Sequence, residues 1–269
     1  AHDQQILRVD RERPGPASPT AAPQLRSRAL RALPHLLTLT NLLCGTAAFA
    51  VLITHGSPAV ALTLLAVALV ADLLDGRVAR ALGVSGPLGA VLDSLADLVS
   101  FGLVPAAAIA LASEEPASLL SYVAGAAIIA AAGYRLARFT AEALTGALHP
   151  AASTTTPKPA SQKPAFKGLP VTIPAAILVG ATVSGLDVSP ALMAAGALVL
   201  AALMVSRIPF RSFKDRPLLA ILAPVGFVGL VASVGAGSAL FGLGATLALA
   251  GVFFVLYGVL TAATRQVTL

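Results

Sequence analysis

Eight apolar stretches, each close to the length that crosses a bilayer, decide what this chain can fold into. A membrane-spanning helix needs about 20 predominantly apolar residues. Of the 269 residues, 57% are hydrophobic and only 11% are charged, whereas a soluble domain carries roughly 25% charged residues. We therefore predict an all-α polytopic membrane protein with spans near 36–55, 58–80, 88–112, 117–140, 169–186, 190–206, 217–234 and 238–262.

The basic residues predict how these spans are oriented. All 18 Lys and Arg lie before the first span, after the last, or around every second connection between spans. The only charged residues in the opposite connections are Glu114, Glu115 and Asp187. Basic residues mark the cytoplasmic side, so we expect a multi-pass protein of the cell (inner or plasma) membrane with both termini cytoplasmic. This topology and the attraction of anionic lipid explain the pI near 10.1. Membrane lipids are therefore expected partners, and nucleic acid is not.

Two polar segments flank or interrupt the spans. Residues 1–33 hold six Arg and a Pro-rich run, which predicts a disordered cytoplasmic juxtamembrane tail. Its last part, 26–36, is compatible both with an amphipathic helix on the membrane surface and with a solvated basic tail. Residues 143–166 are rich in Ser, Thr, Pro and Lys, which predicts a flexible cytoplasmic loop.

Four aspartates lie within the second and third spans, where ionisable side chains are costly and usually functional. In the second span, Asp72, Asp75, Gly76 and Ala79 follow the spacing i, i+3, i+4, i+7. This spacing places them on one helical stripe. Two carboxylates therefore stand beside a notch of small side chains, which suits a bulky charged ligand.

The third span carries the other two acids. Gly89, Asp93 and Asp97 are four residues apart and share a face. The link between the two spans, Gly83-Val-Ser-Gly86-Pro87, is short and rich in turn residues. We therefore expect the two helices to pack antiparallel, with their acidic faces meeting near the cytoplasmic surface.

Four converging carboxylates require a counter-charge, because like charges this close oppose one another's ionisation. No His or Cys lies between Asp72 and Asp97, so an all-oxygen site predicts one or two hard ions, Mg²⁺, Mn²⁺ or Ca²⁺, rather than zinc. A metal beside Arg80 and small residues suits a phosphate or pyrophosphate. Two alternatives remain at this point: salt bridges from the acids to Arg77 and Arg80, and a cation- or proton-coupled transporter.

The same residues resemble the signature of the CDP-alcohol phosphotransferases. The pattern Asp72-x2-Asp75-Gly76-x2-Ala79-Arg80-x8-Gly89-x3-Asp93-x3-Asp97 agrees at all eight defined positions. Four further stretches are similar to the phosphatidylserine synthase branch, so that the resemblance covers roughly residues 35–215. These stretches are Thr38–Gly45, Arg135–Phe139, Phe166–Pro170 and Ser206–Lys214.

The resemblance implies a fold and an assembly. It implies that residues 34–215 form a six-helix catalytic transmembrane core and that 216–269 add two C-terminal transmembrane helices, giving eight spans. It also implies a homodimer.

The resemblance further implies roles for individual residues. Asp72, Asp75, Asp93 and Asp97 would bind two divalent ions, Mg²⁺ or Mn²⁺ or else Ca²⁺, and Asp97 would also be the general base. The residues implied to bind the CDP moiety are Asn41, Asp72, Gly76, Ala79 and Arg80.

The implied reaction is attack of the L-serine hydroxyl on CDP-diacylglycerol, giving phosphatidylserine and CMP. The serine carboxylate needs a basic partner, and Arg135, Arg138 and Lys167 are the available candidates, although cytoplasmic anchoring explains each of them as well. Thr140 stands where members of the branch often have Asn. The acceptor is therefore open between serine and another alcohol such as glycerol 3-phosphate or inositol phosphate.

Overall fold

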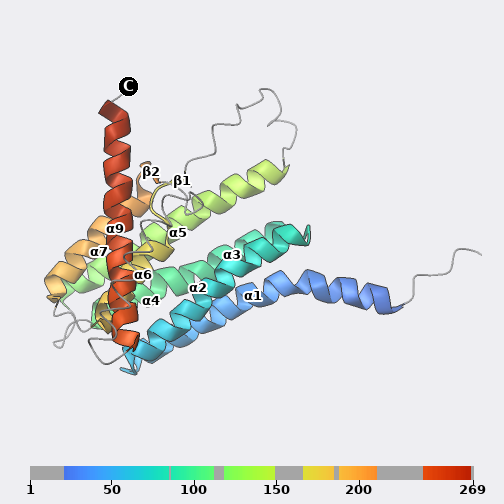
Figure 1. Ribbon diagram of the computed structural model, residues 1–269, viewed down its shortest axis with the longest axis horizontal. Coiled ribbons are helices and arrows are strands. Elements are labelled where there is room, and N and C mark those ends of the chain that lie inside the picture. Colours follow the sequence, from blue (N-terminus) through green and yellow to red (C-terminus); the bar gives the residue numbers. More distant parts are fainter. Residues whose placement is uncertain are drawn as a thin grey trace, which may run out of the picture.

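The computed structural model describes residues 21–84, 86–111, 118–148, 166–184, 188–210 and 239–267. Apart from two strands of two residues each, the regular structure in these ranges is helical. Figure 1 shows the long helices α1, α2 and α5 and the α3–α4 run lying broadly along one direction, with α9 crossing them. The predicted all-α class is thus confirmed for the described residues.

Four helical segments are long and apolar enough to cross a membrane, at Ala32–Ile53, Pro58–Ala81, Pro87–Leu111 and Leu119–Thr145. They match the first four predicted spans within a few residues. The elements that form them are α1 (Ala21–Ile53), α2 (Pro58–Ala81), α3 (Pro87–Leu98), the π-helix η1 (Val99–Leu103), α4 (Val104–Leu111) and α5 (Leu119–Leu148).

The described residues of the C-terminal half form three apolar helices. Helices α6 (Thr172–Val183) and α7 (Pro190–Val205) are apolar but shorter than the usual 20 residues. Helix α9 (Ala239–Val267) has 29 residues, and its side chains are described over 245–259, an apolar stretch. The span predicted at 217–234 lies outside the described residues, so the count of eight remains a prediction.

Two helices extend beyond their expected ends. Helix α1 begins at Ala21 and continues through Pro34 without interruption, so the described part of the predicted tail is helical. Helix α5 runs to Leu148 and includes the first residues of the segment expected to be a loop. In both cases the helix extends past the apolar segment from which its end was predicted.

The turn between α2 and α3 forms as predicted. Gly83 adopts a positive φ of 63°, and the Val84 amide donates to the Ala79 carbonyl at 3.0 Å. This is the pattern of a glycine-terminated helix. Pro87 then begins α3 at a position where its missing N–H costs nothing.

Over the described residues, the α2 and α3 backbones approach each other less closely than each approaches α1. The expected meeting of the two helices holds for the side chains of their acidic faces, whereas the closer backbone packing is made through α1. The facing positions of α2 and α3 hold carboxylates and glycines, which leaves little apolar surface to bring the two backbones together.

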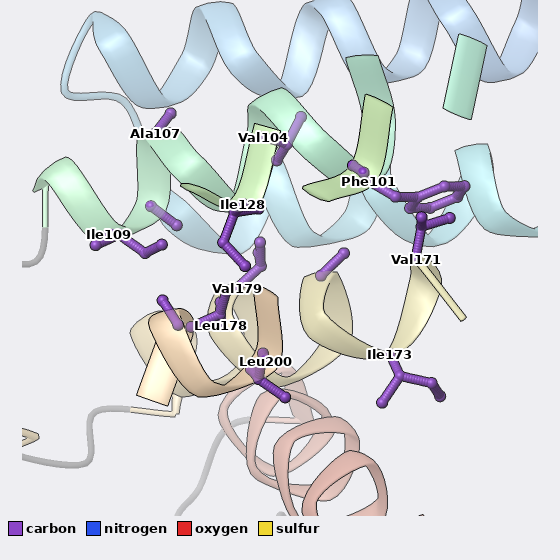
Figure 2. Packing of buried hydrophobic residues seen from close by; sticks show 14 of the residues in the cluster. Phe101, Val104, Ala107, Ile109, Ile128, Val171, Ile173, Leu178, Val179 and Leu200 are labelled. Atoms are coloured by element: carbon purple, nitrogen blue, oxygen red, sulfur yellow. The ribbon is translucent and has the colours of Figure 1, made fainter. Parts of the chain in front are cut away.

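The apolar core lies away from the acids, between η1, α4, α5, α6 and α7. Figure 2 shows Phe101, Val104, Ile128, Val179 and neighbouring side chains interdigitating there, and these four are at most 1% exposed. The inner faces of α1 and α2 also contribute to this core, while large apolar side chains on their other faces, such as Leu43 and Val70, are exposed. These outward-facing surfaces are what a membrane-embedded helix presents to lipid.

The two strands join distant parts of the chain. Strand β1 (Phe166–Lys167) pairs antiparallel with β2 (Pro209–Phe210), and the Gly168 amide donates to the Ile208 carbonyl at 2.9 Å. Gly168 has a φ of 88°, and a Cβ there would lie 2.5 Å from the Met204 carbonyl oxygen. Only glycine fits this position.

Candidate active site

Three aspartates from α2 and α3 meet at one point. Asp72, Asp75 and Asp93, which we call the three-acid group, each offer an oxygen within 4.8 Å of the others. The predicted meeting of the two acidic faces is confirmed. Oδ1 of Asp93 is buried and has no hydrogen-bond partner among the described residues. Buried polar atoms are normally satisfied, so this oxygen fits a ligand to a cation.

A cleft of about 160 Å³ opens beside the three-acid group. Gly76, Ala79 and Arg80 line it from α2, and Gly89 lines it from α3. A Cβ on Gly76 would lie 3.3 Å from Nη1 of Arg80, so glycine at this position keeps the guanidinium close to the helix. The small-residue notch predicted from helical spacing is thus part of a real cleft.

Thr38 of α1 holds one member of the three-acid group. Its hydroxyl lies 2.7 Å from Oδ2 of Asp75 and 3.0 Å from the Pro34 carbonyl oxygen. Thr38 is only 3% exposed. A buried hydroxyl that donates to a carboxylate fixes its rotamer, so α1 orients an acid of α2.

Asp97 differs from the other three acids. It is 8% exposed and does not belong to the three-acid group, although its carboxyl lies at hydrogen-bonding distance from that of Asp72. Its Oδ1 accepts a hydrogen bond of 3.0 Å from Nδ2 of Asn41. Oδ1 of Asn41 in turn accepts from Ser100 Oγ at 2.7 Å. We call Asn41, Ser100 and Asp97 the buried network.

Of the residues expected to contact CDP, three line the cleft, whereas Asp72 and Asn41 do not. Those three are Gly76, Ala79 and Arg80, and Asn41 is fully buried. Its side-chain bonds go to Asp97 and Ser100 instead.

The basic candidates for the acceptor site are only partly described. Arg135 of α5 is buried and lies close enough to Asp97 and to Arg138 for the charges to interact. The Lys167 side chain lies outside the described residues. Ser94 of α3 and Thr140 of α5 are joined by a hydroxyl–hydroxyl hydrogen bond, so the position where this chain departs from its branch faces the helix that carries Asp97.

Sequence reasoning gave no role to Thr38, Ser100 or His35, although all three lie at the site. Thr38 and Asn41 are three residues apart and share a face of α1, so a polar pair within an apolar span was an available signal. His35 lines the cleft opposite Gly89, where a Cβ would lie 3.5 Å from its Cε1. A single His beside Pro34 gave no comparable pattern.

Comparison with known proteins identifies the family. The sequence matches the profile of the CDP-alcohol phosphatidyltransferases over residues 31–208. The chain belongs to this family. The resemblance seen in the Asp72–Asp97 signature is thereby confirmed, and the enzyme class with it.

Individual relatives carry one name, CDP-diacylglycerol–serine O-phosphatidyltransferase. A Bacillus subtilis protein is 30% identical over 68% of this chain and 91% of its own length. A Mycobacterium bovis protein is 43% identical over 29% of this chain, and a Saccharomyces cerevisiae protein is 39% identical over 40% of it. The matched region spans only 27% of the mycobacterial relative and 36% of the yeast one.

Proposed function

We propose that this CDP-alcohol phosphatidyltransferase transfers the phosphatidyl group of CDP-diacylglycerol to L-serine, giving phosphatidylserine and CMP. The observation that carries the proposal is the three-acid group at the mouth of a cleft bordered by Gly76, Ala79 and Arg80. The name shared by the relatives supports serine as the acceptor. Family membership also favours group transfer over the transporter alternative.

The donor set fits divalent metal. Asp72, Asp75 and Asp93 present carboxylate oxygens within 4.8 Å of one another, and Oδ1 of Asp93 is buried without a hydrogen-bond partner among the described residues. Hard ions such as Mg²⁺ and Mn²⁺ prefer such ligands. We propose that these three acids, with Asp97, hold two such ions. When bound, the ions would neutralise the diphosphate and the charge that develops on it.

The cleft residues bind and orient the nucleotide end of the lipid. Gly76 and Ala79 leave room beside the acids, and the guanidinium of Arg80 supplies positive charge and a planar set of donors suited to phosphate oxygens. The diacylglycerol part extends towards the exposed apolar surface of α2, which carries Val67, Val70 and Leu73.

Asp97 accepts the proton of the serine hydroxyl. The hydroxyl oxygen forms a bond to the lipid-side phosphorus, the bond from that phosphorus to the oxygen of CMP breaks, and the proton passes to the Asp97 carboxylate. A hydroxyl is a weak nucleophile without such a base. Arg135, whose charge interacts with that of Asp97, is the proposed partner of the serine carboxylate, and Arg138 and Lys167 are the further candidates.

The proposal includes a setting in the cell membrane. The one-sided distribution of Lys and Arg supports cytoplasmic termini, which places the cleft where soluble serine and released CMP can exchange. A homodimer is the proposed assembly.

A panel of acceptors tests the proposal. Purified protein in detergent micelles, with CDP-diacylglycerol and Mg²⁺ or Mn²⁺, is assayed for CMP release with serine, glycerol 3-phosphate, inositol phosphate and no acceptor. Release above background with serine alone is the expected result. CMP release with a phosphorylated acceptor but not with serine would show that this acceptor, and not serine, is the substrate. The absence of CMP release with every acceptor and either ion would contradict group transfer.

A further inference from the structure

Two helices that are distant in sequence share three buried polar side chains. Ser100 Oγ lies 2.7 Å from Oδ1 of Asn41, and Nδ2 of Asn41 lies 3.0 Å from Oδ1 of Asp97. Asn41 and Ser100 are fully buried, and Asp97 is 8% exposed. A chain of hydrogen bonds therefore runs from η1 through α1 to the acid beside the three-acid group.

The chain has a direction, which the Asp97 carboxylate sets. An asparagine side chain has one accepting end and one donating end. Because an ionised carboxylate only accepts hydrogen bonds, Nδ2 of Asn41 faces Asp97 and Oδ1 faces the Ser100 hydroxyl, which also lies 3.1 Å from the Asn41 backbone carbonyl oxygen. The reverse orientation would place a carbonyl oxygen against a carboxylate, and a buried amide cannot recover the lost bond from water.

The backbone around Ser100 is built for this contact. The π-helix η1 begins two residues after Asp97 and contains Ser100, and such helices are frequent at functional sites. On the facing helix, a Cβ on Gly45 would lie 2.1 Å from Ser100 Oγ and 2.9 Å from its Cα. Glycine at 45 is thus what lets α1 approach closely enough for Asn41 to reach both partners.

We propose that Asn41 and Ser100 are positioning residues that act through Asp97. They hold Oδ1 of Asp97 as a hydrogen-bond acceptor, which leaves Oδ2 to take the proton of the acceptor hydroxyl. The role of Asp97 as the base in this inference rests on the proposed function. The positioning role of Asn41 replaces the nucleotide contact implied for it, because Asn41 is buried and does not line the cleft.

Steady-state kinetics distinguish a positioning role of Asn41 from a role in binding the nucleotide. We expect Asn41→Ala and the isosteric Asn41→Asp to lower kcat about 10- to 100-fold, which is the usual worth of a buried hydrogen bond to a charged group. KM for CDP-diacylglycerol should change less than about threefold. A KM increase of tenfold or more with kcat retained would overturn the proposal, because it would mean that Asn41 binds the nucleotide.

A double-variant cycle tests whether Ser100 acts through Asn41. Ser100→Ala alone should lower kcat about three- to tenfold, and adding it to Asn41→Ala should lower kcat no further. Fully multiplicative effects would overturn the proposal. Ser184→Ala is the matched control, since Ser184 is equally buried but lies at the end of α6, away from the acids, and we expect its kcat to be unchanged.

Thermal unfolding in detergent gives a readout that does not depend on the acceptor. The Tm losses of Ser100→Ala and Asn41→Asp should be non-additive, because Ser100 donates to the side chain at position 41 and the strength of that bond depends on whether residue 41 is Asn or Asp. Additive losses would overturn the inference whichever alcohol is used. Non-additive losses together with failure of the serine assay would contradict the proposed function alone. Both substitutions nearly preserve side-chain volume, so the cycle is retained if Asn41→Ala does not fold.

Discussion

The three-acid group and the buried network lie side by side but are built in opposite ways. The three-acid group borders a cleft, and one of its buried oxygens has no hydrogen-bond partner among the described residues. In the buried network, Oδ1 of Asp97 and both ends of the Asn41 amide are bonded. A carboxylate oxygen without a hydrogen-bond partner is available to bind an incoming ligand. A carboxylate that already accepts a hydrogen bond is held in one orientation.

Asp93→Asn should have the largest effect, because it removes the ligand that the cleft leaves unsatisfied. We expect CMP release to fall about 10⁴-fold, as a metal ion is worth several kcal/mol of transition-state stabilisation. Mn²⁺ binding, measured by electron paramagnetic resonance, should weaken in parallel. Glu142→Gln changes an exposed acid on α5 and should leave both unchanged. Undiminished Mn²⁺ binding in Asp93→Asn would remove the metal role of this group.

Asp97→Asn should affect catalysis more than metal binding, which distinguishes the buried network from the three-acid group. It keeps the volume but removes the base, so we expect kcat to fall about 10²- to 10³-fold, within the range of general base catalysis. Mn²⁺ should still bind more tightly than to Asp93→Asn, since Asp97 lies outside the three-acid group. If kcat stayed at the wild-type value, the assignment of the base would fail while the metal site could survive.

Thr38→Val should weaken metal binding at the three-acid group. Valine keeps the shape of threonine but removes the hydroxyl 2.7 Å from Asp75. Partners of this kind typically contribute 10- to 100-fold to metal affinity. We expect the Mn²⁺ concentration for half-maximal CMP release to rise about tenfold, with kcat at saturating metal largely kept. Thr46→Val is the control, because it removes an exposed hydroxyl on the same helix, and its half-maximal Mn²⁺ concentration should equal that of the wild type. An unchanged half-maximal Mn²⁺ concentration in Thr38→Val would contradict the role of Thr38.

Gly45→Ala should damage the buried network through packing. The added methyl would meet Ser100, including its Cα at 2.9 Å, and overpacking of this kind costs about 1–3 kcal/mol. A lower Tm should accompany a reduced kcat. Gly196→Ala is the matched control, because no atom lies within 4 Å of the added Cβ, and its Tm should be equal or slightly higher. Equal Tm values for the two variants would show that α1 does not need this close approach.

Much of the site could be predicted because its parts are local. The spacings within Asp72–Ala79 and Gly89–Asp97 fix one face on each helix, whatever the rest of the chain does. The turn at Gly83 and Pro87 is likewise local. The resemblance to the family rested on the same residues, and the match over 31–208 confirms it.

Other features could not be predicted, because they depend on how helices pack. Periodicity could not show that α2 and α3 leave a cleft between them, nor that α1 bridges both helices. A separation of 56 residues between Asn41 and Asp97 carries no periodic signal. Helix ends were also misjudged where apolar character stops before the helix does, as at Leu148.

The sequence by itself determined the apolar spans, the one-sided positive charge and four acids on two faces joined by a tight turn, because chain-local rules govern each of them. Only the tertiary structure decided which three acids form the three-acid group and which one joins the buried network. Helical spacing sets a direction around one axis, whereas the distance between helices depends on side chains such as Gly45 and Ser100 that must fit across the interface. That fit brings Ser100 to Asn41, and through Asn41 to Asp97.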